Sequence, residues 1–445
     1  MIILRTVKNI SSLNIVASIL LFLTAIMAAL IANSPMAPMY QDFLSQELHL
    51  RIGNFNLLSH GGHPLKMIEF INDCLMTVFF LAVGLEIKRE LLVGELSSFR
   101  KAALPFVAAC GGMLVPVIIY SFLVVSGTPE TRGMAIPMAT DIAFSLGVLS
   151  LLGKRVPLSL KIFLTAFAVV DDIGGILVIA IFYSNEVAYG YLIVAAILYC
   201  FLYYMGKFGM TQKIFFLFFG IVIWYLFLQS GIHSTISGVI LAFVIPARPR
   251  LDAGRYIERI REVITGFPVF KSDNIVLTNE QIATLKQVER ASDYVISPLQ
   301  SLEDNLHGMV NFVILPLFAF ANAGVVFSGG GNIVGDVSIA VAVGLLLGKF
   351  VGIYLFTWLT IKSGLAPMPA GMNWKNIAGV SLLGGIGFTV SLFIANLSFA
   401  SNYPELLNQA KLGVLLGTVL AGILGYIVLN AVLPKIKKSC KSAVE

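Results

Sequence analysis

The sequence predicts an all-α polytopic membrane protein. Hydrophobic residues make up 58% of its 445 residues and charged residues only 12%, which gives a mean hydropathy of +0.89. A soluble chain of this length needs far more charged surface, so the composition excludes an ordinary soluble enzyme or binding protein. The 40 glycines fit helices that pack closely or break inside a bilayer.

Apolar runs long enough to cross the membrane recur along the whole chain, which we treat as one transmembrane domain, residues 1–445. About twelve transmembrane helices are predicted, near residues 13–32, 67–86, 102–125, 134–152, 158–183, 187–206, 213–229, 232–247, 308–327, 337–360, 376–398 and 410–434.

Two polar segments interrupt these runs. Residues 45–58 include alternating apolar and polar residues around Gly53-Asn54, which predicts an outer β-hairpin. Residues 248–306 form a predicted cytoplasmic loop, in which 277–295 has the spacing of an amphipathic helix capped by Thr278 or Asn279. The sequence suggests no purpose for this loop.

The basic residues predict the orientation. With both termini in the cytoplasm, 25 of the 30 Lys and Arg residues fall in cytoplasmic segments, four fall outside and Lys349 lies within a span. This bias follows the positive-inside rule and explains the net charge of +6 without a nucleic-acid partner. A cleaved signal peptide at 13–32 is the alternative, but its apolar stretch is long for one and its removal leaves an odd number of spans.

Four ionisable residues lie deep in predicted spans: Asp141, Asp171, Asp172 and Lys349. Each costs about 2.5–3.5 kcal/mol at the centre of a helix on insertion scales. Interhelical pairing that serves only assembly is one explanation, but a single base leaves two of the three acids unpaired.

Asp171 and Asp172 are adjacent on one predicted helix, so their side chains point about 100° apart. The two carboxylates therefore cannot bind one ion symmetrically. We expect one of them to face a cavity while its neighbour contacts another helix. A carboxylate beside a water-filled cavity binds either a proton or a hard cation. Competition between those two ligands is the minimum chemistry of a cation/proton exchanger.

Two predicted spans contain residues that break helices. Residues 134–148 place Pro137, Thr140 and Asp141 at mid-span, and residues 380–394 place Gly384, Gly385 and Gly387 at a matching depth. Interrupted segments in corresponding halves indicate a transporter site at the midplane. Such breaks expose the ends of helix dipoles, which Asp141 and Lys349 could neutralise beside any functional role.

With these residues identified, the chain resembles the NhaA family of bacterial sodium/proton antiporters, in collinear order over nearly its whole length. The matching stretches are INDCLMTVFFLAVGLEIKRELLVGEL (71–96), MAIPMATDIAFSLGVLSLLGKRVPLSLKIFLTAFAVVDDIGG (134–175), SGIHSTISGVI (230–240), ILPLFAFANAGV (314–325), GLLLGKFVGI (344–353) and GGIGFTVSLFIA (384–395).

The resemblance implies a role for each buried charge. Asp172 would be the central cation ligand, which alternates between Na⁺ and protons, with Asp171 as a further candidate Na⁺ ligand that pairs with Lys349. Asp141 and Thr140 would lie where two discontinuous helices cross at mid-membrane. The family's fold further implies inverted repeats built from spans three to five and ten to twelve, and a homodimer held partly by the outer hairpin.

The resemblance also implies a pH-sensing cluster. Its candidates are Glu86, Glu90, Glu303, His307 and His233, whereas Asp304 stands where the family often has histidine. Two plainer interpretations remain open. The stretch from Glu86 to Glu90 also fits a solvated helix end whose ion pairs contribute under ~1 kcal/mol each, and His233 also fits a helix-end histidine without a sensing role.

The function expected is pH-regulated, electrogenic exchange of cytoplasmic Na⁺ or Li⁺ for external H⁺, in a bacterial inner membrane, without a cofactor. A sodium-coupled solute symporter and a channel are alternatives, which the buried acid–lysine combination disfavours. An enzyme is not expected: a diphosphate-binding DDxxD pattern fails at Gly175, an intramembrane aspartyl protease would want a GxGD-like motif that the three acids lack, and no GxxxxGK[ST] loop is present.

Overall fold

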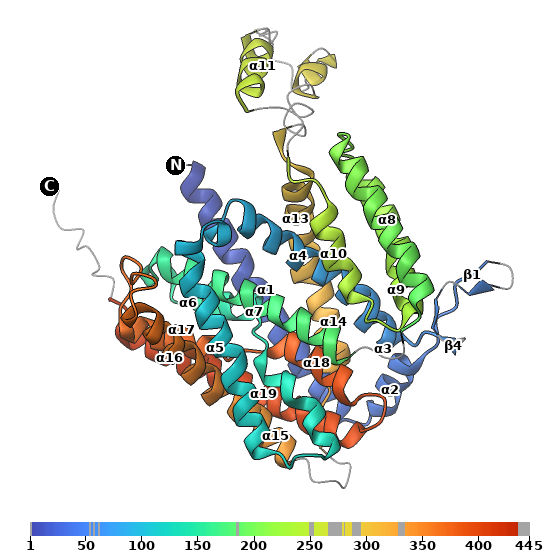
Figure 1. The fold of residues 1–445 in the computed structure, drawn as a ribbon, viewed down its shortest axis with the longest axis vertical. Helices are drawn as coiled ribbons and strands as arrows, with labels where there is room; N and C mark the ends of the chain where they lie inside the picture. The colour runs from blue at the N-terminus through green and yellow to red at the C-terminus, as the bar shows by residue number, and fades with distance from the viewer. Residues whose placement is uncertain are drawn as a thin grey trace.

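The protein is an all-α bundle in a computed structural model that describes residues 2–52, 55–56, 58–60, 63–183, 187–248, 253–265, 278–279, 281–286, 295–327 and 334–434 (Figure 1). The helices of its first half are α1 (Ile2–Ala32), α2 (Ala37–Ser45), α3 (Met67–Phe70), α4 (Met76–Leu92), α5 (Phe99–Leu123), α6 (Ile142–Leu151), α7 (Leu158–Phe182), α8 (Tyr189–Lys207), α9 (Lys213–Ser230) and α10 (Thr235–Val244). The helices that follow are α11 (Ala253–Thr265), α13 (Pro298–Met309), α14 (Leu315–Asn322), α15 (Asp336–Val343), α16 (Lys349–Lys362), α17 (Trp374–Leu383), α18 (Phe388–Phe399) and α19 (Pro404–Val432).

Within the described residues, nine continuous helical segments are long and apolar enough to cross a membrane. Two bent pairs raise the number to eleven: the 3₁₀ segment Pro129–Met138 with α6, and α17 with α18. The twelfth predicted span, 232–247, contains only the ten-residue helix α10. Pro246 explains its early end, because the residue before a proline is disfavoured in helical conformation. The chain is therefore a multi-pass membrane protein.

Three spans contain a single π-helical turn: Ile71–Leu75 before α4, Val310–Ile314 between α13 and α14, and Gly344–Gly348 between α15 and α16. Such turns rotate the side chains that follow them and are frequent at functional sites. The third turn directly precedes Lys349, so it sets the direction in which that side chain leaves the helix.

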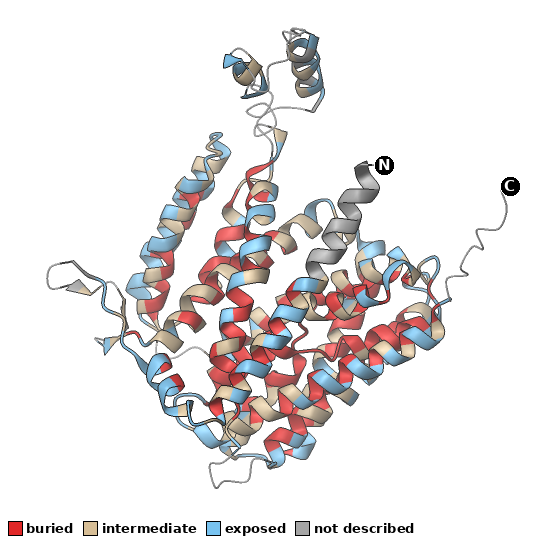
Figure 2. Cartoon of the chain, turned by 180° about the vertical axis from the view of Figure 1, so that it is seen from behind, coloured by how far each residue is buried: buried red, intermediate tan, exposed pale blue. Residues whose placement is uncertain are grey.

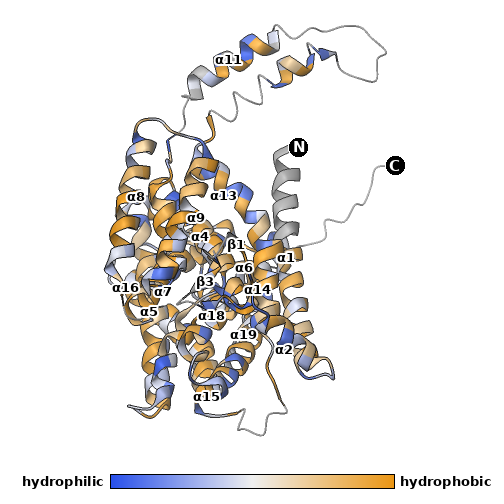
Figure 3. Ribbon diagram, turned by 90° about the vertical axis from the view of Figure 1, so that its right-hand side faces the viewer, coloured by the Kyte–Doolittle hydropathy of each residue, from blue (hydrophilic) through white to orange (hydrophobic). Residues whose placement is uncertain are grey.

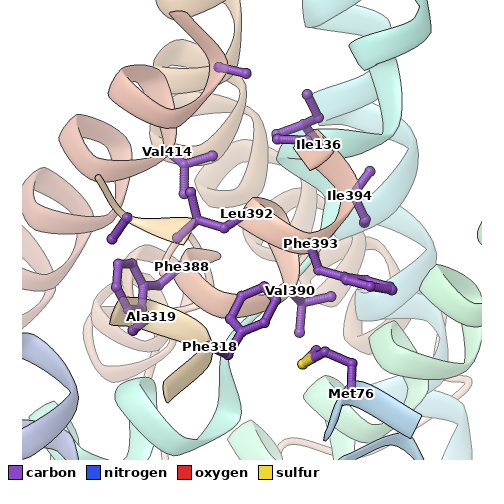
Figure 4. Packing of buried hydrophobic residues seen from close by; sticks show 14 of the residues in the cluster. Met76, Ile136, Phe318, Ala319, Phe388, Val390, Leu392, Phe393, Ile394 and Val414 are labelled. Carbon is purple, nitrogen blue, oxygen red and sulfur yellow. The ribbon is translucent and has the colours of Figure 1, made fainter. Parts of the chain in front are cut away.

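The helices differ in how much of their surface lies inside the bundle. Nearly every residue of α18 is buried, which is the pattern of a helix surrounded by protein on all sides. Its Phe388, Val390 and Phe393 join Met76 of α4 and Phe318 of α14 in the central apolar cluster (Figure 4). By contrast α8 and α9 stand at the edge of the bundle and present exposed residues along their outer faces (Figure 2). Apolar colouring extends over the outer helices as well, as a bilayer requires (Figure 3).

The close packing of α5 against α16 places Lys349 in the core. A Cβ atom on Gly352 would lie 2.2 Å from the carbonyl oxygen of Gly111, so this crossing tolerates no side chain. Small residues allow helix backbones to approach in this way inside a membrane. Consequently Lys349, one turn before Gly352, is fully buried.

The outer segment contains two short strand pairs. Strand β1 (Arg51–Ile52) pairs with β2 (Phe55–Asn56) across the predicted turn at 53–54, which lies outside the described residues. A second pair, β3 (Ser59–His60) with β4 (His63–Pro64), follows it and was not predicted. An isolated bridge between Glu47 and Lys66 closes the segment at its base.

The predicted loop 248–306 is shorter than expected, because α13 begins at Pro298. Ser297 caps this helix by accepting a hydrogen bond from the Gln300 N–H at 3.2 Å, and Pro298 occupies the first helical position, where its missing N–H costs nothing. The loop also contains α11, which was not predicted. Of the helix predicted at 277–295, residues 279, 281–286 and 295 are helical, whereas 277, 280 and 287–294 lie outside the described residues. Thr278 Oγ1 accepts from the Gln281 N–H at 3.3 Å.

Candidate functional site

Two spans are broken at mid-length and cross each other at their breaks. The Pro129–Met138 segment and α6 are bent by 44°, and α17 and α18 by 43°. Between the first two, Ala139 and Asp141 have extended backbone. The Asp141 N–H donates to the carbonyl oxygen of Ile386 at 2.6 Å, so backbone groups freed by one break are satisfied by the other.

Side chains from the first break also satisfy carbonyls at the end of α17. The Thr140 hydroxyl donates to the Gly384 carbonyl at 2.8 Å, and the Ser145 hydroxyl donates to the Leu383 carbonyl at 3.1 Å. A Cβ atom on Gly387 would lie 2.9 Å from the carbonyl oxygen of Ala139, so glycine permits the close crossing. The predicted breaks are thus parts of one hydrogen-bonded crossing.

Asp141 lies at the N-termini of two half-helices. Its Oδ1 accepts from the Phe144 N–H at 2.9 Å and caps α6. Its Oδ2 accepts from the Thr389 N–H at 3.2 Å and from the Thr389 hydroxyl at 2.7 Å, in the first turn of α18. One carboxylate therefore meets the positive ends of two helix dipoles.

Asp171 and Lys349 form a buried ion pair. Lys349 Nζ lies 2.7 Å from Asp171 Oδ2, and both side chains are fully inaccessible to solvent. The lysine also lies over the ring of Phe167, 5.6 Å from its centroid. Within the described part of the chain, Asp171 Oδ1 has no hydrogen-bond partner, so this carboxylate is only half satisfied.

Asp172 faces a cavity of about 260 Å³ whose wall also contains Thr140, Asp141 and Thr389. Asp171, the preceding residue on α7, is not part of that wall, so the two adjacent acids point to different surroundings as the helical geometry predicts. Among the described residues, the Asp172 carboxylate makes no hydrogen bond or ion pair, although the residue is 94% buried, with only 6% exposed.

The same cavity continues to a charged group on α4 and α13, formed by Glu86, Arg89, Glu303, Asp304 and His307. Arg89 Nη1 lies 3.4 Å from Glu303 Oε1. The three acids outnumber the arginine, so this end of the cavity attracts cations. The cavity therefore connects Asp172 to the side predicted to be cytoplasmic.

The other two predicted pH-sensing residues lie off the cavity wall. Glu90 is next to the charged group: its Oε1 pairs with Arg89 at 3.1 Å and its Oε2 accepts from the Glu95 N–H at 3.0 Å. His233 lies apart, before α10, where its Nε2 is 3.5 Å from Asp73 Oδ1 and its Nδ1 is 2.9 Å from the Thr235 hydroxyl.

Two participants in this site were not predicted from the sequence. Thr389 supplies two of the three hydrogen bonds to the Asp141 carboxylate, and Arg89 joins Glu303 to Glu90. A threonine just after the glycine-rich break was a usable signal, since hydroxyl side chains favour helix N-termini. The contact of Arg89 with Glu303 gave no sequence signal because it joins α4 to α13, more than 200 residues further along the chain.

The chemistry of the cavity wall suits a small hard cation. Asp172, Asp141, Thr140 and Thr389 place carboxylate and hydroxyl oxygens around one space, and oxygen atoms are the preferred ligands of such ions. Direct binding by Asp171 as well would require its bond to Lys349 to change. The arrangement can thus exchange an ion or a proton at Asp172 while the crossing stays intact.

Comparisons with known proteins agree with this chemistry. The family model described as Na⁺/H⁺ antiporter 1 matches residues 8–429. A protein of Bacteroides thetaiotaomicron named Na⁺/H⁺ antiporter NhaA is 76% identical over 98% of this chain and 100% of its own length. Proteins of the same name from Phocaeicola vulgatus and Porphyromonas gingivalis are 61% and 45% identical, over 94% and 96% of this chain and 93% and 96% of their own lengths.

Proposed function

The chain belongs to the Na⁺/H⁺ antiporter 1 family, and from this premise we propose that it exchanges cytoplasmic Na⁺ or Li⁺ for external H⁺ at Asp172. The observation that carries the assignment is the carboxylate of Asp172, which is buried, faces the cavity and has no partner among the described residues. A buried carboxylate without a partner is costly unless it binds a proton or a cation.

Exchange follows from competition at this carboxylate. Na⁺ binds only the ionised form of Asp172, whereas a proton neutralises it, so the two ligands exclude each other. Rising cytoplasmic pH promotes deprotonation of Asp172 and hence Na⁺ loading from the charged entrance of the cavity. Release of Na⁺ on the outer side leaves the Asp172 carboxylate free to take up a proton. The protonated site then returns to face the cytoplasm.

Asp171 and Lys349 supply the second part of the cycle. The ion pair keeps Asp171 away from the cavity, and its opening on cation binding would free a second carboxylate oxygen for Na⁺. If the buried acids and the lysine titrate as one coupled group, two protons replace one Na⁺. Exchange is then electrogenic, and each 100 mV across the membrane contributes about 2.3 kcal/mol per net charge moved.

The charged group at the cavity entrance is the proposed site of pH regulation. Glu86, Glu303 and His307 line the entrance, and Glu90 forms an ion pair with Arg89, which also lines it. Changes in the protonation of this charged group would alter the attraction of the cavity entrance for Na⁺. We propose that His233 contributes separately to pH regulation, through its contact with Asp73 in the π-helical turn before α4.

The proposed location is a bacterial inner membrane, with both termini and the 248–297 loop in the cytoplasm, as the basic residues indicate. Two copies of the chain would associate partly through the strand segment at 45–64, which carries paired strands at the edge of the bundle. Lipid surrounds the remaining apolar surface.

Everted membrane vesicles containing a pH-sensitive dye test the assignment. Addition of Na⁺ or Li⁺ should collapse an imposed proton gradient for the wild type. Asp172→Asn preserves the shape of the side chain but cannot ionise, so we expect no response above that of vesicles without the protein. A wild-type response from this variant would show that the exchange site lies elsewhere.

Asp73→Asn is the matched control. Asp73 is also an acid within a span, but it faces His233 and does not line the cavity. We therefore expect this variant to respond to Na⁺, with a change only in its pH profile because the contact with His233 is altered. Loss of response in both variants would mean that removal of any acid within a span disables the protein.

A further inference from the structure

A groove outside the cation pathway opens between the start of α5, the start of α7 and the connection from α16 to α17. Its volume is about 270 Å³, and none of its lining residues lines the cavity at Asp172. Ser159 ties one edge of it to the α16–α17 connection, because its hydroxyl donates to the Ala370 carbonyl at 2.8 Å.

The mouth of the groove is basic. Arg100 and Lys101 are consecutive residues in the first turn of α5, both exposed and both in the groove lining. Within the described part of the chain neither side chain has an ion-pair or hydrogen-bond partner. Glu95 is the one acid in the lining, so the described lining carries a net charge of +1.

The wall of the groove below these charges is apolar. Leu104, Ile162 and Phe163 form part of this wall. Leu104 and Phe163 are buried, whereas Ile162 is 37% exposed. Beside the groove, Phe99 and Leu158 are 85% and 72% exposed, which is the behaviour of side chains that contact lipid tails. The groove therefore lies where the apolar belt of the bundle meets its basic side.

We propose that this groove binds an anionic phospholipid of the leaflet on that side. The phosphodiester contacts Arg100 and Lys101, and the start of an acyl chain lies along Ile162. A guanidinium and an ammonium together suit phosphate oxygens, and basic pockets between helices on the cytoplasmic side are typical headgroup sites. Free phosphate offers the same oxygens, but it leaves the apolar wall uncovered, which favours a lipid.

Charge and position both fit this occupant. One phosphodiester charge balances the net charge of the lining. Because the groove contacts α5, α7 and the α16–α17 connection, a lipid there touches the elements that lead to Asp171 and Lys349 without touching either residue. The site is independent of the exchange chemistry, so binding can be measured without transport.

Native mass spectrometry of the full-length purified protein, titrated with phosphatidylglycerol, tests the proposal. The double variant Arg100→Gln with Lys101→Gln should lower affinity for the first bound lipid roughly 30-fold, since each basic residue near an anionic surface contributes about fivefold. Phosphatidylcholine, which has no net charge, should bind the wild type no better than it binds this variant.

The matched control removes two other basic charges on the same side, by Lys154→Gln with Lys362→Gln. Neither residue lines the groove, and Lys362 lies over the ring of Trp358. We expect this control to keep wild-type affinity. An equal loss in both double variants would overturn the site, because the lipid would then be responding to overall charge.

Two further measurements separate a lipid from a free anion. Ile162→Glu keeps both basic residues but places a carboxylate on the acyl wall, so phosphatidylglycerol binding should fall at least tenfold; unchanged binding would overturn the placement of the acyl chain. Inorganic phosphate at the lipid's concentration should not displace the lipid. If it does, the groove is a free-phosphate site and the lipid assignment is wrong.

Discussion

Asp141 and Asp172 line the same cavity and are almost equally buried, with 3% and 6% of each residue exposed, yet their surroundings differ completely. The Asp141 carboxylate accepts three hydrogen bonds from the N-terminal turns of α6 and α18. The Asp172 carboxylate accepts none from the described residues. Burial alone therefore does not distinguish a hydrogen-bonded acid from one that is free to bind an ion.

The difference in hydrogen bonding indicates which of the two acids is free to bind an ion. Hydrogen bonds to an ionised carboxylate compensate for the water it has lost, so Asp141 has little need of a further ligand. Asp172 has no such compensation from the described residues, and in the proposed function a proton and Na⁺ supply it in turn. The crossing therefore positions the cavity, and the exchange that we propose takes place at the unpaired acid on the neighbouring helix.

The largest expected effect separates these two acids directly. Na⁺ binding to the purified protein, measured by calorimetry, should weaken more than roughly 100-fold in Asp172→Asn, because the variant loses the charge that an ion in low dielectric requires. In Asp141→Asn the amide oxygen still accepts hydrogen bonds at the crossing, so we expect a loss of about tenfold or less. Equal losses would remove the distinction between the two acids.

The next effect concerns stability and the neighbouring ion pair. Lys349→Ala leaves Asp171 as an uncompensated buried charge, which should lower the free energy of unfolding by about 3–5 kcal/mol, measured by thermal unfolding in detergent. The double variant Asp171→Asn with Lys349→Met removes both charges and should recover most of that stability while remaining inactive in vesicles. If the double variant is no more stable than Lys349→Ala, the loss of stability in Lys349→Ala does not come from an unpaired Asp171.

Much of the fold could be predicted from the sequence because bilayer thickness fixes the length of apolar runs. Eleven predicted spans correspond to the nine long helical segments and two bent pairs of the described chain. In the exception, 232–247, three residues at each end lie outside the ten-residue helix α10, since apolarity alone does not report where a helix begins or ends. The start of α13 was missed for the opposite reason: its first turns are polar although they are helical.

The site was predictable only as far as it depends on one helix. The divergence of Asp171 from Asp172 follows from helical geometry, and the structure places them accordingly. By contrast, the hydrogen bond from the Thr389 hydroxyl to Asp141 joins α18 to the first break, nearly 250 residues away in the chain. The resemblance paired Asp171 with Lys349, but no local pattern could indicate that Asp141 would receive Thr389.

A smaller loss of stability should follow from removal of the satisfied acid. Asp141→Ala leaves the N–H groups of Phe144 and Thr389 without their acceptor at two helix starts. Unsatisfied donors and a lost helix cap together should cost about 2–4 kcal/mol, measured in the same thermal assay. Asp141→Asn should lose less than half as much, because its carbonyl still accepts. If Asp172→Ala proves as destabilising as Asp141→Ala, the two acids would be structurally equivalent.

The smallest effect is expected at the cavity entrance, where Arg89 contacts both Glu303 and Glu90. Arg89→Gln removes a positive charge that favours the ionised acids, so the pH profile of Na⁺-dependent exchange should shift to more alkaline values. Partly exposed ion pairs contribute about 0.2–1 kcal/mol, which corresponds to a shift below about 0.7 pH unit. Glu90→Gln releases Arg89 to interact more with Glu303, so its shift should be smaller and toward acidic pH. Lys154→Gln, an exposed residue off the cavity, should leave the profile unchanged, and a shift of equal size there would attribute the effect to net charge rather than to this entrance.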